Sequence, residues 1–138
     1  MFTQKFDSYV CEGDTIETER DGFTVTARIV RDPDYGIDDD DMHNPDQSVT
    51  GCTDEEHARA MSARQEWLDD RWFYCGIILS VSRNGHLIDD HAASLWGIEA
   101  NYPGSDNSYL AEVANELLDE ALESASQSRD KIIEALSA

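Results

Sequence analysis

Carboxylates recur at a helical spacing in the last third of the chain. Glu112, Glu116, Asp119 and Glu123 follow one another at intervals of four, three and four residues, with Glu120 beside them. An α-helix rises about 1.5 Å per residue, so neighbouring charges would lie roughly 4.5–6 Å apart, close to the spacing of phosphates along a nucleic-acid strand. Like charges at these intervals cost a few tenths of a kcal/mol per pair. The row therefore indicates a use other than helix stability.

Acidic residues are also concentrated in two segments that contain no lysine or arginine. The chain has 30 acidic and 10 basic residues, which gives a formal net charge of −20. Ten carboxylates lie between Arg31 and Arg59, and nine lie between Arg83 and Arg129. A surface with this much negative charge repels phosphate backbones and anionic lipid, which argues against direct binding to nucleic acid or to a membrane.

These patterns predict a non-enzymatic mimic of nucleic-acid charge whose partner is a basic nucleic-acid-binding protein. Its carboxylates would occupy the basic groove of that protein and gain from counterion release and electrostatic steering. If they are exposed beside the row, two aromatic residues would anchor the interface, because aromatic side chains dominate many binding sites. The partner-binding residues predicted from the sequence are Glu112, Glu116, Asp119, Glu120, Glu123, Asp38, Asp39, Asp40, Asp41, Trp96 and Tyr102.

Four other interpretations of the acidity stay open, one of which is binding to a basic protein that is not a nucleic-acid binder. The charge could merely keep an adaptor or structural interaction protein soluble. It could reflect adaptation to high salt, since the chain has two lysines against eight arginines and 18 aspartates against 12 glutamates. The segment from Asp32 to Asp46 could also bind a divalent cation, since such ions prefer carboxylate oxygens. A homodimer is compatible with all of these.

Motifs for a dedicated metal site or for catalysis are weak. Counted from Asp32, the acidic segment has Gly36 at position five and His43 at position twelve, which does not match an EF-hand. Cys52 and His57 do not have the spacing of a common structural zinc site. The pairing of His86 and His91 with Asp89 and Asp90 lacks a nucleophile motif. We therefore expect no enzymatic activity, no cofactor and no metal ligand set.

The cysteines and the N-terminus favour a cytoplasmic protein. Three cysteines at irregular spacing do not form the framework of a secreted disulfide-rich domain. The first residues lack the apolar segment of a signal peptide. The longest apolar run, from Trp72 to Leu79, is too short to span a membrane.

Two hairpins are predicted to hold these residues. Asp21-Gly22 separates strands over 14–20 and 23–31, and Asn84-Gly85 separates a strand over 72–83 from one that returns through 87–98. Asp89, Asp90 and His91 break the alternation of the last strand, which indicates a β-bulge.

Helices and a loop account for the remaining segments. Thr53 is a good N-cap for a helix over about 54–69, and Ser105 or Asp106 could cap a second helix whose apolar residues recur from Leu110 to Leu122. Where this second helix ends is not decided by the sequence. Residues 32–47 are predicted to form a mobile acidic loop. We therefore expect one α+β domain over residues 1–138, with an antiparallel sheet of about four strands and two or three helices packed on one face.

The segment from Trp72 to Leu122 resembles a group of small acidic uncharacterised proteins of bacterial plasmids, integrated elements and phages. The most specific parts are SLWGIE, which begins at Ser94, and YLAEVANELLDEAL, which begins at Tyr109. The resemblance covers about a third of the chain and implies a bacterial cytosolic setting. Because mobile elements encounter host nucleases, it also suggests an anti-restriction or anti-CRISPR inhibitor. No activity or catalytic residue follows from it.

Overall fold

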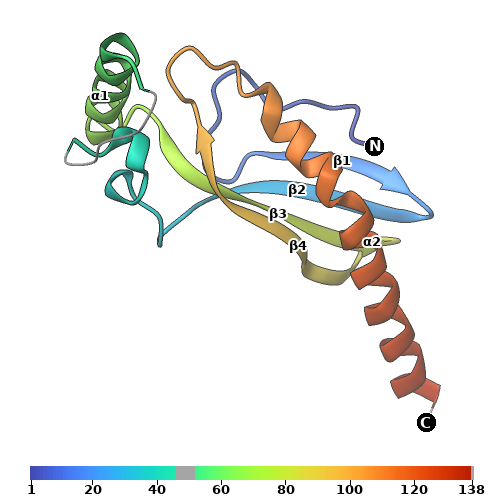
Figure 1. Ribbon diagram of the computed structural model, residues 1–138. Coiled ribbons are helices and arrows are strands. Elements are labelled where there is room, and N and C mark those ends of the chain that lie inside the picture. The colour runs from blue at the N-terminus through green and yellow to red at the C-terminus, as the bar shows by residue number, and fades with distance from the viewer. Residues whose placement is uncertain (46–51, 138) are drawn as a thin grey trace.

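The computed structural model describes residues 1–45 and 52–137, which form a four-stranded antiparallel sheet with two α-helices. The strands are β1 (Thr15–Arg20), β2 (Phe23–Arg31), β3 (Phe73–Arg83) and β4 (His86–Ala100), and they lie in the sheet in the order of the sequence. The helices are α1 (Asp54–Leu68) and α2 (Ser108–Ser137). The α+β class and the four antiparallel strands predicted from the sequence are confirmed (Figure 1).

Both predicted two-residue turns are present. Asp21 and Gly22 have φ angles of 55° and 81°, and Asn84 and Gly85 have φ angles of 52° and 80°. Positive φ at both central residues is the requirement of a type I′ turn, whose twist matches that of the flanking strands. Local turn chemistry thus sets the register of both hairpins.

The last strand is irregular in two regions, the first of which spans two adjacent register shifts around Val81. Leu79 of β3 pairs with Ala93, whereas Val81 pairs with Asp89, so β4 carries extra residues at the predicted bulge. A second bulge lies closer to the end of β4. Cys75 pairs with Ile98 but Ile77 pairs with Leu95, so β4 has one extra residue here, and Gly97 takes a φ of 72°. The second bulge was not expected from the sequence, and it decides where the neighbouring Trp96 points.

Helix α2 covers one face of the sheet. Alternate residues of β3, from Phe73 to Val81, form a core with Leu110, Ala114 and Leu118 of the helix. The helix is continuous for 30 residues, which settles the end that the sequence left undecided. Figure 1 shows α2 crossing the sheet and extending beyond its end.

Helix α1 lies at the other end of the sheet (Figure 1). It begins after Thr53, whose hydroxyl accepts a hydrogen bond from the backbone N–H of Glu56 at 3.1 Å, as predicted. Two short 3₁₀ helices, η1 (Ile37–Asp39) and η2 (Asp41–His43), precede it. Trp72 and Tyr74 form a second core cluster with Ile37, separate from the one beneath α2. The expectation that the helices share one face therefore applies to α2, while α1 packs beside this second cluster.

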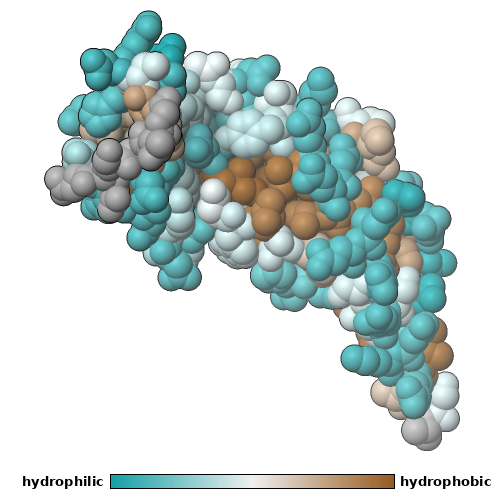
Figure 2. Space-filling model, viewed as in Figure 1, coloured by the Kyte–Doolittle hydropathy of each residue, from teal (hydrophilic) through white to brown (hydrophobic). Residues whose placement is uncertain are grey.

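Hydrophobic side chains are not all enclosed. Figure 2 shows apolar surface in the middle of the α2 face and along the projecting end of that helix. The exposed apolar residues of the projecting end are Ile132, Ile133 and Leu136. The homodimer considered from the sequence stays a prediction. No helix among the described residues is long and apolar enough to cross a membrane.

Candidate functional site

The predicted carboxylate row lies on the solvent side of α2. Glu112, Glu116, Asp119, Glu120 and Glu123 are all exposed. The helix places Glu112, Glu116, Asp119 and Glu123 on one stripe, because their intervals of three and four residues match the helical period. Asp119 forms an ion pair with Arg20 of β1 at 3.4 Å, and both side chains are solvent-exposed. The side chains of the other four make no hydrogen bond or ion pair with the residues that the structure describes.

The row is longer than the sequence analysis predicted. Because α2 continues to Ser137, Asp130 and Glu134 fall on the same stripe as Glu112, and both are exposed. Twenty-two residues separate Glu112 from Glu134, which corresponds to about 33 Å of helix. Arg129 pairs with its neighbour Asp130 at 3.3 Å, an exposed contact of small energetic value. These two acids were missed because the sequence did not show whether the helix passes Ser124, Ser126 and Ser128.

The four consecutive aspartates of the acidic segment have different surroundings. Asp38 pairs with Arg64 of α1 at 2.7 Å, and the carboxylate of Asp39 accepts from the backbone N–H of Gly36 at 2.8 Å. Asp41 is exposed. Asp40 points inward, and its side chain is only 18% exposed. These residues therefore do not form one uniform charged patch, and the predicted mobility of residues 32–47 stays a prediction, with 46 and 47 outside the described residues.

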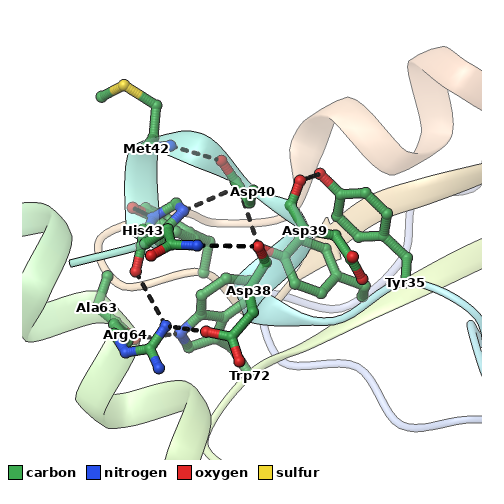
Figure 3. A network of polar contacts seen from close by, with 12 residues as sticks. Tyr35, Asp38, Asp39, Asp40, Met42, His43, Ala63, Arg64 and Trp72 are labelled. Carbon is green, nitrogen blue, oxygen red and sulfur yellow. Dashed lines mark hydrogen bonds and ion pairs between the residues drawn. The ribbon is translucent and has the colours of Figure 1, made fainter. Parts of the chain in front are cut away.

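Asp40 is the centre of the polar network in Figure 3. One carboxylate oxygen lies 2.8 Å from Nδ1 of His43 and accepts from the hydroxyl of Tyr74 at 3.0 Å. The other accepts from the backbone N–H of Met42 at 3.1 Å. Burial, and to a smaller extent the charge of Asp40, raises the pKa of Tyr74. Its hydroxyl therefore stays protonated and donates a hydrogen bond to the carboxylate.

His43 continues the network toward the segment after β4. Its Nε2 atom lies 2.7 Å from the hydroxyl of Tyr102, and the imidazole is 4% exposed. Burial is the main reason that the pKa of Tyr102 is raised, so in the neutral imidazole Nδ1–H donates to Asp40 and Nε2 accepts from Tyr102. Both ring nitrogens are thus used within the fold. The network joins η2, β3 and the turn after β4, and no sequence motif signals it.

A hollow of about 560 Å³ lies beside this network. Tyr102 and His43 line it together with Glu99 of β4 and residues of α1. Glu99 is partly buried, and its side chain makes no hydrogen bond or ion pair with the residues that the structure describes. Burial raises its pKa, and the nearby His43 partly offsets that effect. The negative charge of the ionised Glu99 carboxylate is therefore poorly stabilised by its surroundings.

The two predicted aromatic anchors do not lie beside the carboxylate row. Tyr102 packs with the second core cluster, 4.8 Å from Trp72 between ring centroids. Trp96 covers Gly76, whose neighbours Cys75 and Ile77 point toward α2, so its indole lies on the opposite face of the sheet. The condition set for these anchors, exposure beside the row, is not met, because Tyr102 packs in the second core cluster and the second bulge of β4 turns Trp96 away from α2. Trp96 is nevertheless 39% exposed.

The metal and nucleophile candidates are also placed. Among the described ranges 1–45 and 52–137, no group of three or more histidine, cysteine, aspartate or glutamate residues could hold a metal ion. The three cysteines are free, and burial raises the pKa of Cys75 to about 12. His91 contacts the hydroxyl of Ser94 through Nε2 at 2.8 Å. This contact brings an imidazole to a hydroxyl group, but Asp89 accepts from the backbone N–H of His91, and among the described residues no carboxylate contacts the imidazole.

No family model, curated protein or solved structure matches this chain. The resemblance to small acidic proteins of mobile elements therefore stays an expectation. Functional assignment rests on the geometry and charge of the described residues.

Proposed function

We propose that this chain is an acidic nucleic-acid mimic that binds the basic groove of a nucleic-acid-binding protein and occludes it without chemical catalysis. The observation that supports the proposal is the exposed row of carboxylates along one continuous helix, α2. An inhibitor of restriction or CRISPR nucleases in the bacterial cytoplasm is the specific form that we put forward.

The rigidity of the scaffold supports this function. Leu110, Ala114, Leu118 and Ala121 bury the opposite side of the helix in the sheet. The backbone of this part of α2 is therefore held in place before binding, so little backbone conformational entropy is lost when a partner engages the carboxylates. A flexible acidic tail would provide the same charge without a defined spacing.

The sparse internal neutralisation of the row also supports it. Among the described residues, Asp119 and Asp130 are the members of the stripe that pair with an arginine, and both pairs are solvent-exposed. Close like charges cost a few tenths of a kcal/mol per pair, so the fold would be more stable with fewer of them. A cationic groove would remove this repulsion and release the counterions of both surfaces. A solubilising surface needs no such alignment.

The proposal can be tested by competition with DNA. Fluorescence anisotropy would follow a labelled duplex bound to each member of a panel of bacterial restriction and CRISPR nucleases as this chain is added. We expect displacement from at least one nuclease, with an inhibition constant that rises steeply between about 50 and 200 mM salt, the range over which phosphate-type contacts weaken strongly.

Charge reversals with equal net effect locate the surface. Glu112→Lys with Glu116→Lys changes α2, whereas Glu17→Lys with Glu19→Lys makes the same change of +4 on exposed positions of β1. We expect the α2 pair to weaken displacement at least about tenfold, as loss of about 1.4 kcal/mol would, and the β1 pair to weaken it much less. Circular dichroism would verify that both variants are folded. Equal effects of the two pairs, or no displacement from any nuclease, would contradict the proposal.

A further inference from the structure

A second acidic feature lies on the face of the sheet opposite to α2. Trp96, Gly97 and Tyr35 border a pocket of about 570 Å³ together with Asp32, Pro33 and Asp34. The pocket joins the end of β2 to the second bulge of β4. None of its residues belongs to the carboxylate row.

The indole of Trp96 is held in place from two sides. A Cβ atom at Gly76 would lie only 2.3 Å from the indole, so the ring rests directly on the backbone of β3. The Nε1–H group donates to the hydroxyl of Ser94 at 3.2 Å. One ring face is therefore covered by the strand, and the side chain remains partly exposed at the pocket.

Asp32 builds the opposite wall. Its Oδ2 atom accepts from the backbone N–H of Gly97 at 3.0 Å, and its Oδ1 atom accepts from the backbone N–H of Asp34 at 2.9 Å. The first bond joins residues that are 65 positions apart in the sequence. Asp34 makes no side-chain hydrogen bond or ion pair among the described residues, and it is exposed. The pocket thus combines a fixed aromatic ring with two carboxylates, one of which has no partner in the part of the chain that the structure describes.

This combination favours a planar organic cation. The face of an indole attracts cations through its quadrupole, and a guanidinium group can stack on the ring while its N–H groups donate to carboxylates. An anion would be repelled by Asp32 and Asp34, and an apolar ligand would desolvate them. Because Trp96 is already fixed, binding costs little side-chain entropy.

We propose that the pocket of Asp32, Asp34, Tyr35 and Trp96 binds an arginine side chain. If the proposed function holds, that arginine belongs to the basic partner. The site would act as an aromatic anchor separate from the carboxylate row, on the far side of the sheet near β4. A partner that uses both sites would have to enclose this edge strand.

The test uses the full chain and a small probe, so it needs no knowledge of the partner. N-acetyl-arginine amide would be titrated while ¹H–¹⁵N NMR follows the indole N–H of Trp96 and the backbone amide of Gly97. N-acetyl-citrulline amide is the matched neutral ligand. We expect saturable shifts of both signals with arginine and none with citrulline.

Three variants decide which residues bind the probe. Trp96→Leu, followed at Gly97, should weaken the affinity by about twofold to fivefold, the range expected for loss of an exposed cation–π contact. Asp34→Asn should weaken it too and keeps the test valid if Trp96→Leu unfolds. Glu19→Gln removes one exposed charge from β1, outside both the pocket and the carboxylate row, and should leave the affinity unchanged.

The outcomes are distinct from those of the proposed function. Equal shifts with citrulline, or weak unsaturable shifts spread over all acidic surfaces, would overturn the arginine site. An equal loss with Asp34→Asn and Glu19→Gln would overturn it as well, since general electrostatic attraction would then suffice. DNA competition that depends on α2 could still succeed in each of these cases, and the pocket could bind arginine even if no nuclease is displaced.

Discussion

Replacing Gly76 by alanine should displace Trp96, because the indole occupies the space that a side chain would need. A Cβ atom at this position would lie 2.3 Å from Cε3, 2.5 Å from Cδ2 and 2.6 Å from Cζ3 of the ring. Carbon atoms in favourable contact are about 3.5–4.0 Å apart, so the ring must move by more than about 1 Å. Overpacking of this kind costs about 1–3 kcal/mol.

A second effect of the same substitution has the opposite sign. Glycine inside a strand is less favourable than alanine by about 0.5–1 kcal/mol. The net change for Gly76→Ala in the natural chain should therefore be a loss of up to about 2.5 kcal/mol. In a Trp96→Ala background the clash is absent, so the same substitution should stabilise the fold by about 0.5–1 kcal/mol. The double-mutant cycle thus predicts a reversal of sign.

Urea unfolding followed by circular dichroism would measure the four free energies, since removal of a tryptophan does not compromise that signal. The α2 helix dominates it and reports on the whole fold. If Gly76→Ala has the same effect on stability with and without Trp96, the indole does not occupy the space above Gly76. The proposed arginine pocket would then lack its rigid aromatic wall. The arginine probe provides a second readout, because a displaced ring should weaken its binding.

Three further substitutions test the buried polar groups. Asp40→Ala should lower the free energy of unfolding by about 2 kcal/mol in urea, because it leaves His43 and Tyr74 without their acceptor. The control Asp41→Ala should change the free energy of unfolding by less than about 0.5 kcal/mol. Similar values for the two variants would contradict the inward placement of Asp40. Tyr109→Phe should stabilise the fold by about 1 kcal/mol, because this buried hydroxyl has no hydrogen-bond partner among the described residues, and a loss of stability would indicate a missed partner. Glu99→Gln should stabilise the fold at pH 7, because burial raises the pKa of this carboxyl and the fold is then weakened as pH rises through that value. The gain should shrink toward pH 4 in unfolding curves recorded at both values, and a gain independent of pH would refute the assignment.

The hairpins could be predicted from the sequence because their signals are local. Asp21-Gly22 and Asn84-Gly85 each supply two residues that tolerate positive φ, and alternating apolar residues fix the buried face. The carboxylate row was equally accessible, since it depends only on helical periodicity. Its extension to Glu134 was not, because the serines at 124, 126 and 128 leave the end of a helix undecided in the absence of tertiary contacts.

The network and the pocket could not be predicted, since both depend on contacts between distant segments. Asp40 and Tyr74 are 34 residues apart, and His43 and Tyr102 are 59 apart. The side of the sheet on which Trp96 lies could not be predicted for a different reason. Strand alternation alone does not give its side, because the bulge at Gly97 shifts the register between β3 and β4.

Net charge by itself is a poor guide to the functional surface of this protein. The acidic segment around Asp40 is as rich in carboxylates as α2, yet the side chains of Asp38, Asp39 and Asp40 accept hydrogen bonds from protein groups or pair with an arginine. Those carboxylates hold the 3₁₀ helices against β3 and α1, so the fold itself explains them. Most of the row on α2 has no such internal partner and opposes helix stability. Carboxylates that the fold does not need are the ones that a partner has to explain, and this difference favours α2 over the loop as the mimetic surface.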